Sequence, residues 1–249
     1  MEHTIIITGS SSGLGLGFLH HYSSQPSTRI IALDISPPPS STSTLKSVTF
    51  YKADITSTDS LASISADLKD APIHMLIHCA GIRGLVPSIV REKEGDVAAA
   101  ETLEAMDRDT MIRTLEINTW GSLNVVRSLL PHLERAAAYS QTTGAPPPKA
   151  IFMSSRMGSV GANSGGGGYA YRASKAALNA IIKSLSIDVK GVVFLALHPG
   201  RVETGLVEWK EEGAMTVEES LETCLPVIGR LKLTDSGSFL DRFGEEIRW

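Results

Sequence analysis

The sequence is poor in cysteine, and its two cysteines lie far apart. Cys79 and Cys224 are the only ones in 249 residues, and neither belongs to a C-x-x-C or Cys/His pattern of the kind that holds a metal ion. We therefore predict neither a disulfide framework nor a metal site. A reduced chain is the simple interpretation, and it predicts a cytoplasmic protein.

Long hydrophobic runs and an excess of basic charge are also missing. No segment reaches the roughly 18 apolar residues of a membrane span, and the apolar part of the opening MEHTIIITGS is too short for a signal peptide. Lys and Arg total 23 against 27 for Asp and Glu, the formal net charge is -4, and the basic residues form no run. We therefore expect a small-molecule partner, and neither nucleic acid nor a membrane.

The chain does contain a regular alternation of strand and helix patterns. Short apolar runs rich in β-branched or aromatic residues predict strands at 4–8, 29–33, 48–52, 73–78, 150–155 and 192–198. Between them, apolar residues recur every three or four positions, as at Leu123, Val126, Leu130 and Leu133, which predicts helices. The predicted fold class is α/β, with residues 1–249 forming a single doubly wound, Rossmann-type domain around a parallel sheet of about seven strands. The charged segment at 91–109 shows no strand pattern, and we interpret it as a helical excursion or a flap.

A glycine-rich turn follows the first predicted strand. TGSSSGLG places Gly9, Gly13 and Gly15 between that strand and a helix. Glycines there let the backbone approach a pyrophosphate, whose charge is favoured by the free N–H groups of the helix N-terminus. Tight turns in α/β proteins also need glycine without any ligand, so this spacing alone leaves both interpretations open.

Asp34 ends the second predicted strand and favours the dinucleotide interpretation. A carboxylate there accepts hydrogen bonds from an adenosine ribose and repels a 2'-phosphate. No Arg or Lys stands in TGSSSGLG or just after Asp34 to receive that phosphate. We therefore predict NAD(H) rather than NADP(H); the plainer alternative is a solvated aspartate at a strand end.

A tyrosine and a lysine stand four residues apart in YAYRASK. Tyr171 and Lys175 share one face of a predicted helix, whereas Tyr169 points elsewhere. An ammonium near a phenol stabilises the phenolate and lowers the tyrosine pKa from about 10, which makes the phenol a general acid or base near neutral pH. Such a pair is common by chance, so its meaning depends on the motifs around it.

Six motifs, in order along the chain, resemble those of the short-chain dehydrogenase/reductase family. They are TGSSSGLG, KADIT, INTWG, MSSRMGS, YRASK and HPGRVET. The resemblance runs along nearly the full length and identifies the chain as a member of that family. It implies an NAD(P)-dependent enzyme with a cofactor half at about 1–110 and a catalytic and substrate half at about 111–249.

The resemblance implies roles for particular residues. Tyr171 is the expected acid/base that exchanges a proton with the carbonyl or alcohol oxygen, and Ser155 is expected to hydrogen-bond the same oxygen. Lys175 would lower the pKa of the tyrosine and hold the nicotinamide ribose. Asn118 would anchor a water that links Lys175 to solvent. Ser154 and Ser155 both suit the serine role by type, and we choose Ser155 because the family usually uses the second serine.

The resemblance also implies how NAD, or NADP as the alternative, is held. Asp54 and Ile55 follow the third strand as expected adenine contacts. Val202 and Thr204 are expected to bind the nicotinamide carboxamide. The full set of expected cofactor contacts is Gly9, Ser11, Ser12, Gly13, Leu14, Gly15, Asp34, Asp54, Ile55, Ala80, Gly81, Tyr171, Lys175, Pro199, Gly200, Val202 and Thr204.

The family's NNAG motif reads HCAG here, from His78 to Gly81. Cys79 lacks the amide with which an asparagine supports the central sheet, so we expect weaker support at this point. We interpret His78 and Cys79 as strand residues rather than a nucleophilic pair, because neighbours on a strand face opposite sides.

The C-terminal third and the glycine run indicate the branch of the family and the form of the substrate pocket. The ending DSGSFLDRFGEEIRW resembles that of C-factor-like and sniffer-like carbonyl reductases. The short stretch between Thr204 and Met215 predicts a small lid and an open pocket, with Trp209 as a candidate substrate contact. The run SGGGG at 164–168 predicts a loop beside the substrate entrance, either a loosening element or a passive insertion, with Tyr169 as a candidate pocket wall.

Three functions follow from these features. The leading one is an NAD(H)-dependent oxidoreductase that interconverts an alcohol with a ketone or aldehyde, and the second is an NADP(H)-dependent carbonyl reductase. The third is a non-catalytic dinucleotide-binding regulatory or signalling protein, against which Asn118, Ser155, Tyr171 and Lys175 argue because a binder does not need all four. The resemblance also implies a homodimer or homotetramer paired through helices at about 108–138 and 169–188.

Overall fold

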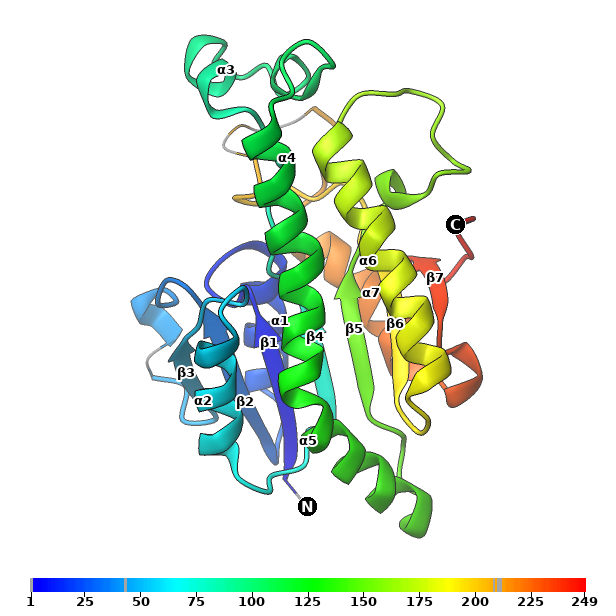
Figure 1. Ribbon diagram of the computed structural model, residues 1–249. Coiled ribbons are helices and arrows are strands. Elements are labelled where there is room, and N and C mark those ends of the chain that lie inside the picture. Colours follow the sequence, from blue (N-terminus) through cyan, green and yellow to red (C-terminus); the bar gives the residue numbers. More distant parts are fainter. Residues whose placement is uncertain (1, 43, 208, 210–211) are drawn as a thin grey trace.

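The computed structural model describes residues 2–42, 44–207, 209 and 212–249, and a parallel sheet organises them (Figure 1). The strand order is β3-β2-β1-β4-β5-β6-β7, and every neighbouring pair is parallel. The strands are β1 (His3–Thr8), β2 (Thr28–Asp34), β3 (Val48–Lys52), β4 (Met75–His78), β5 (Lys149–Met153), β6 (Val193–His198) and β7 (Ser238–Asp241).

Helices connect the strands and cover both faces of the sheet. The α-helices are α1 (Gly13–Ser23), α2 (Thr58–Leu68), α3 (Pro87–Glu92), α4 (Arg108–Leu115), α5 (Ser122–Thr143), α6 (Tyr169–Asp188) and α7 (Val217–Arg230). Shorter turns of 3₁₀ helix are η1 (Ser40–Thr42), η2 (Ala99–Glu101), η4 (Arg156–Gly158) and η5 (Leu233–Asp235). A π-helical turn, η3 (Glu116–Gly121), joins α4 to α5, so these two helices form one continuous rod.

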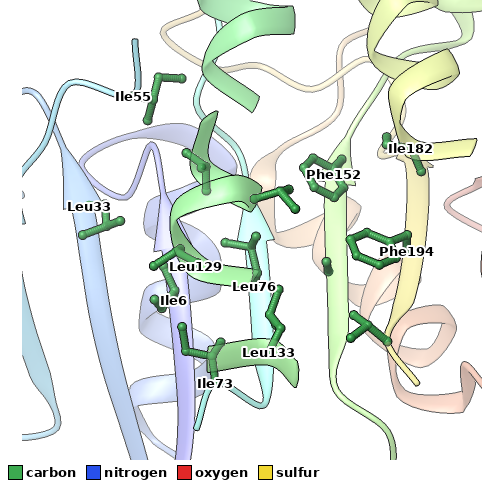
Figure 2. Close-up of a cluster of buried hydrophobic side chains, with 14 of the residues drawn as sticks. Ile6, Leu33, Ile55, Ile73, Leu76, Leu129, Leu133, Phe152, Ile182 and Phe194 are labelled. Atoms are coloured by element: carbon green, nitrogen blue, oxygen red, sulfur yellow. The ribbon is translucent and has the colours of Figure 1, made fainter. Parts of the chain in front are cut away.

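Alternate residues of each strand supply two separate cores, because successive side chains point to opposite faces. On one face, Ile6 belongs to a cluster that includes residues of α2, α5 and α6, among them Leu129 and Ile182 (Figure 2). On the other face, Ile7 belongs with Phe18 of α1 and with α7. The molecule therefore has three layers, and its central strands are apolar on consecutive positions because both faces are covered.

The predicted fold class is confirmed, and five of the six predicted strands agree closely with the structure. The sixth, predicted at 150–155, ends at Met153, which leaves the serines that follow in the loop at the end of the strand. β7 was not among the predicted runs, because it has four residues and only alternate ones are buried. The segment at 91–109 contains the end of α3, the turn η2 and the start of α4.

The strand order reverses between β1 and β4. β1 pairs with β2 on one side and with β4 on the other, so the connections leave the sheet in opposite directions at this point. In open parallel sheets the crevice at such a switch point, beyond the carboxyl ends of the strands, is where ligands bind. The segment that carries α3 rises above this edge of the sheet (Figure 1).

Candidate active site

A cavity of about 1430 Å³ lies at the carboxyl ends of the strands and brings most of the predicted residues together. Its walls come from the ends of β1, β2, β4, β5 and β6 and from the loops that follow them. The predicted residues that line it are Gly9, Ser12, Gly13, Leu14, Gly15, Asp34, Asp54, Ile55, Ala80, Gly81, Ser155, Tyr171, Lys175, Pro199, Gly200, Val202 and Thr204. Ser11 and Asn118 are not among its lining residues, and the structure shows what each of them contacts instead.

The glycine turn brings the backbone of β1 against that of β4. Gly9 has φ +65°, and a Cβ atom there would lie 2.7 Å from the backbone nitrogen of Ala80. A Cβ atom at Gly15 would overlap the carbonyl oxygen of Gly9, so α1 packs directly on the turn. At the start of α1, Ser12 makes no side-chain capping bond, and the first turn carries no acidic residue. This end of the helix therefore presents N–H groups suited to a phosphate.

Asp34 closes one end of the cavity and also holds the glycine turn. Its Oδ2 atom accepts a hydrogen bond from the Ser11 amide at 3.0 Å, and its Oδ1 atom accepts one from the Ser36 amide at 3.2 Å. The Ser11 hydroxyl donates to the carbonyl of Ser36. Ser11 is thus committed to contacts within the protein, which explains why it does not face the cavity.

The two adjacent serines after β5 have different surroundings. Ser154 is buried, and its hydroxyl donates to Oδ1 of Asn179 on α6 at 2.6 Å. Ser155 is only partly buried and lines the cavity; its hydroxyl accepts from the Met157 amide at 3.2 Å, and its side chain lowers the pKa of Tyr171. The pair therefore divides into one serine that fixes the strand to α6 and one that meets the tyrosine in the cavity.

Tyr171 and Tyr169 also differ in their surroundings. Tyr171 is 7% exposed and lines the cavity, whereas Tyr169, at the first position of α6, is 39% exposed. Tyr169 is not among the described residues that line the cavity, so its predicted role as a pocket wall is wrong. Two positions along a helix turn a side chain by about 200°, which accounts for the difference.

Lys175 lies near Tyr171 but does not touch its hydroxyl in this structure. Its Nζ atom donates to the carbonyl oxygen of Met153 at 2.8 Å and lies 5.6 Å from the centroid of the Tyr171 ring. Burial lowers the pKa of Lys175 to about 8, and coupling to Cys79 acts in the opposite direction. The ammonium is therefore poised to lose its proton at mildly alkaline pH.

The pKa of Tyr171 is shifted upward, whereas the sequence predicted a downward shift. Burial raises it above its ordinary value, and the nearby Glu101 carboxylate raises it further. Arg83 and the hydrogen bond with Ser155 lower it, but they do not outweigh the desolvation of the phenolate. Lys175 is not among the groups that shift this pKa, because its ammonium is directed at the β5 backbone.

Asn118 lies in the π-helical turn and fixes the loop after β4. Its Oδ1 atom accepts from the Ile82 amide and its Nδ2 atom donates to the Ile82 carbonyl, both at 2.8 Å. Nδ2 also donates to the Ser174 hydroxyl on α6 at 3.0 Å. A Cβ atom at Gly81 would lie 3.0 Å from the Asn118 Oδ1 atom and 3.7 Å from the Lys175 Nζ atom. The glycine thus keeps open the space between these two side chains.

His78 performs a task that the sequence analysis did not assign to it. Its Nδ1 atom lies 2.8 Å from the Thr8 hydroxyl on β1, and its Nε2 atom lies 2.8 Å from the Ser122 hydroxyl on α5. The sequence predicts weaker support at HCAG because Cys79 lacks an amide. His78 supplies the polar link between the sheet and α5, and its signal was a histidine directly after the apolar residues Met75, Leu76 and Ile77.

The chemistry of Cys79 agrees with its interpretation as a strand residue. Burial raises the pKa of its thiol far above the ordinary value, and only Lys175 opposes this shift. His78 is buried and neutral, because burial lowers its pKa to about 3. A thiol that keeps its proton beside a histidine engaged at both nitrogens is no nucleophilic pair.

The segment after β6 forms the remaining wall. Pro199 accepts a hydrogen bond from the Ser220 hydroxyl at 2.7 Å, and Val202 forms a parallel bridge with Met215. This bridge closes the base of the predicted small lid. Thr204 lies over the glycine turn, since a Cβ atom at Gly13 would be 3.0 Å from it. Trp209 also lines the cavity.

The glycine run at 164–168 lies outside the cavity. None of its residues is among the described lining residues, although Gly168 lies next to Met157 and Glu101, which do line the cavity, so the place of the run beside the substrate entrance stays a prediction. Gly166, Gly167 and Gly168 adopt φ values of +62°, +62° and +59°. The Nε atom of Arg172 donates to the carbonyls of Gly166 and Gly167, at 3.2 and 3.0 Å. The run is a left-handed turn held by an arginine and leads into α6.

Two charged residues that the sequence analysis did not single out lie beside the tyrosine. Arg83 follows HCAGI, and its side chain forms a two-point ion pair with Glu101 of η2. The Cζ atom of Arg83 lies 4.8 Å from the centroid of the Tyr171 ring. Arg83 was signalled by its place just after the HCAG motif, whereas no local pattern in the 91–109 segment distinguishes Glu101.

The residues suit a nicotinamide dinucleotide. The open N-terminus of α1 beside close-packed glycines accommodates a pyrophosphate, and Asp34 stands where an adenosine ribose is bound in folds of this kind. Among the described residues, no group of three or more His, Cys, Asp or Glu side chains is arranged to hold a metal ion. In that same part of the chain, no helix has the length and apolar character that crossing a bilayer requires.

Comparison with known proteins agrees with this site. The short chain dehydrogenase family model matches residues 3–214. The C-signal protein of Myxococcus xanthus is 34% identical over 191 residues, which cover 76% of this chain and 100% of that protein. The solved structure of carbonyl reductase Sniffer of D. melanogaster is 26% identical, with a TM-score of 0.85 and 100% of both chains covered.

A second solved structure, an NADPH bound carbonyl reductase from chicken fatty liver, is 26% identical with a TM-score of 0.83, covering 100% of this chain and 99% of that one. The predicted resemblance to sniffer-like carbonyl reductases is thereby confirmed. Family match, strand order and site geometry lead to one conclusion: the chain belongs to the short chain dehydrogenase family and is an NAD(P)-dependent oxidoreductase.

Proposed function

We propose that this chain transfers a hydride between NAD(H) and a carbonyl compound or secondary alcohol, with Tyr171 as the acid/base. One observation carries the proposal. Ser155, Tyr171 and Lys175 converge in the same cavity that holds the glycine turn and Asp34 at its other end. A dinucleotide extended along the strand ends would bring its reactive ring to those three side chains.

The proton transfer follows from the contact between Tyr171 and Ser155. Both side chains line the cavity, and Ser155 is close enough to lower the pKa of Tyr171, so the two hydroxyls face the same part of the cavity. A carbonyl oxygen at that point receives a hydrogen bond from Ser155, which polarises it, and a proton from Tyr171 as negative charge develops. In the reverse direction the phenolate of Tyr171 removes the proton from an alcohol.

Lys175 and Asn118 have supporting roles in this proposal. The Lys175 ammonium would hold the ribose of a bound dinucleotide. After leaving the Met153 carbonyl, to which it donates in this structure, it would also stabilise the Tyr171 phenolate. Asn118 keeps the loop after β4 in place through its two hydrogen bonds with Ile82. In this proposal a water between Asn118 and Lys175, beside Gly81, which carries no side chain, returns protons from solvent.

The dinucleotide itself supplies the hydride donor or acceptor, and the protein supplies position. Thr204 lies over the glycine turn, and Val202 is tied to Met215, so this strand end is firmly placed beside the expected nicotinamide position. Pro199 is likewise held by Ser220. These residues would hold the nicotinamide on the side of the cavity that also carries Ser155 and Tyr171.

NAD(H) is preferred over NADP(H) in this proposal because of Asp34. Its carboxylate lies at the cavity wall and would repel a 2'-phosphate. NADP(H) is the second candidate, because the chicken carbonyl reductase of similar fold is described as NADPH bound. The two hydrogen bonds that hold Asp34 in place support the first choice, since they keep the carboxylate from turning away.

The proposal also covers where the protein acts and how it assembles. We infer a cytoplasmic homodimer or homotetramer that pairs through α4, α5 and α6. Tyr139 on α5 and Ile187 on α6 are exposed apolar side chains on these helices and support such a pairing. Light scattering of the purified protein at several concentrations measures the assembly directly.

A panel of ketones, aldehydes and secondary alcohols tests the proposed reaction. Turnover is followed by the absorbance of the reduced nicotinamide, with NAD(H) and NADP(H) compared at equal concentration. Reduction or oxidation that favours NAD(H) supports the proposal. Clear binding of a dinucleotide without turnover of any compound would instead favour a regulatory or signalling protein, in keeping with the name of the Myxococcus relative.

A further inference from the structure

Tyr171 is flanked by a largely buried ion pair as well as by Lys175. The Nε and Nη2 atoms of Arg83 donate to the two carboxylate oxygens of Glu101, each at 2.9 Å. The Arg83 and Glu101 side chains are only 16% and 13% exposed. A two-point pair in a fixed fork geometry holds the guanidinium in one orientation, which a single contact would not do.

The guanidinium is directed at the phenol ring. Its Cζ atom lies 4.8 Å from the ring centroid of Tyr171, within the range of a cation–π contact. Lys175 is farther away, with its Nζ atom at 5.6 Å from the same centroid, and it donates to Met153. In the structure as it stands, Arg83 is therefore the nearer cation to the ring.

Backbone contacts fix Glu101 relative to the tyrosine. The amide of Gly168, directly before α6, donates to the carbonyl of Glu101 at 3.0 Å. The amide of Val86 donates to the carbonyl of Ala100 at 3.0 Å. The excursion that carries α3 and η2 is thereby joined both to the loop of Arg83 and to the first turn of the helix that carries Tyr171.

The charged groups around the phenol can be named from each element beside it, and only Arg83 and Glu101 among them shift the pKa of Tyr171. Arg83 comes from the loop after β4, Glu101 from η2 and Lys175 from α6, while Ser155 contributes a hydrogen bond from the loop after β5. Among the described residues, no charged group of α4 shifts the pKa of Tyr171, although α4 packs against α6. Arg83 lowers this pKa and Glu101 raises it, against the larger rise caused by burial.

We propose that Arg83 and Glu101 are a positioning pair for Tyr171, in which Arg83 favours the phenolate and Glu101 limits how strongly it does so. The proposal rests on the proposed function only for its effect on turnover; the effect on the phenol itself does not depend on a reaction. It makes the excursion at 83–107 a determinant of the pH at which the enzyme works.

Arg83 and Glu101 should shift the titration of Tyr171 in opposite directions. This difference distinguishes a positioning pair from an ion pair that only stabilises the loop. Arg83→Gln removes the cation and should move the titration of Tyr171 to higher pH. Glu101→Gln breaks the same ion pair but leaves the cation, and should move the titration to lower pH. If the ion pair only braced the loop, both substitutions would disturb Tyr171 in a similar way.

The titration is read directly from tyrosinate absorbance in the ultraviolet. For each protein, the spectrum of the matching Tyr171→Phe variant is subtracted, so that only Tyr171 contributes. We expect a midpoint about one pH unit higher in Arg83→Gln and a lower midpoint in Glu101→Gln. Arg83→Lys keeps the charge without the fork and should fall between the wild type and Arg83→Gln.

A surface ion pair provides the matched control. Arg135 and Asp70 are joined at 2.7 Å on the outside of the protein and do not line the cavity among the described residues. Arg135→Gln and Asp70→Asn should leave the Tyr171 midpoint unchanged. Thermal unfolding of every variant shows whether it is folded. If Arg83→Gln does not fold, the variants Arg83→Lys and Glu101→Gln still show the direction in which each charge shifts the Tyr171 midpoint.

The outcomes distinguish this inference from the proposed function. Midpoints that move in the same direction for Arg83→Gln and Glu101→Gln, or that do not move, overturn the inference even if the enzyme turns over. Opposite shifts without turnover of any substrate support the inference and count against the proposed function. If both hold, the alkaline limb of kcat/KM for carbonyl reduction moves with the titration midpoint in each variant.

Discussion

The Nε2 atom of His78 lies 2.8 Å from the hydroxyl of Ser122, which itself donates to the carbonyl of Asn118 at 2.7 Å. The other ring nitrogen reaches Thr8 on β1. One buried imidazole thus joins β1, β4 and the π-helical turn that presents Asn118. Burial lowers its pKa to about 3, so it acts as a neutral hydrogen-bonding group.

Replacing His78 should therefore weaken the fold more than its position in a strand suggests. His78→Phe keeps a ring of similar size but leaves Thr8 and Ser122 without this partner. We expect a loss of roughly 2 kcal/mol in the free energy of unfolding, measured by chemical denaturation. His78→Gln should lose less, and His20→Gln, at an exposed position of α1, should be close to neutral. Equal losses in His78→Phe and His78→Gln would contradict the bridging role.

Acid should destabilise the protein through its buried histidines. Burial lowers the pKa of His78 to about 3 and that of His198 to about 4, against about 6.5 in an unfolded chain. Between these values the unfolded chain binds more protons than the folded one, so the free energy of unfolding falls as pH drops below 6.5. Full stability is present above that pH.

The His198 contribution to this acid sensitivity can be isolated. Its Nδ1 atom is the one buried side-chain nitrogen or oxygen without a hydrogen-bond partner among the described residues. His198→Gln should reduce the proton uptake on unfolding near pH 5 by about one proton, seen as a shallower dependence of unfolding free energy on pH. An unchanged slope would show that His198 titrates normally in the folded protein.

Tyr171→Phe should abolish turnover while leaving dinucleotide affinity near that of the wild type. Loss of the phenol removes the proton donor, which we expect to lower kcat by about 10² to 10⁴ or more. Tyr169→Phe is the matched control, because Tyr169 is exposed and does not line the cavity among the described residues. Dinucleotide affinity is measured by fluorescence titration. A comparable loss of kcat in both variants would contradict the assignment of Tyr171 as the acid/base.

Asp34→Arg should shift cofactor preference toward NADP(H). The substitution replaces a carboxylate that repels a 2'-phosphate with a cation that binds it, and we expect at least about a tenfold change in the ratio of the two kcat/KM values. Asp34→Asn removes the charge but keeps an acceptor for the Ser11 amide, so it should produce a smaller shift. A wild-type enzyme that already prefers NADP(H) would refute the role given to Asp34.

The glycine run offers a test of its left-handed turn. Gly168 has φ +59°, and a Cβ atom there would lie 2.7 Å from the terminal methyl carbon of Met157. Gly168→Ala should lower the free energy of unfolding by about 1–2 kcal/mol. Gly165 has neither a positive φ nor a neighbour within 4 Å of an added Cβ, so Gly165→Ala should be neutral by the same measurement.

Sequence patterns predicted the fold because they depend on local chemistry. The apolar runs at 4–8 and 29–33 are covered on both faces, and the parallel sheet follows from their alternation with helices. β7 was missed since four residues with alternate burial carry little signal. The same locality explains how Tyr171 and Lys175 were found: a spacing of four on one helix brings them to one face, whatever the rest of the chain does.

The sequence by itself determined the fold class, the family and most of the site residues that lie in its motifs, because each depends on short motifs whose geometry is set within one strand–turn–helix unit. Only the tertiary structure decided which groups act on Tyr171. Arg83 and Glu101 come from separate segments and meet at 2.9 Å beside a ring on α6, while Lys175 turns toward Met153. The balance of charge and burial around a phenol depends on how distant segments pack, and no spacing along the chain encodes it.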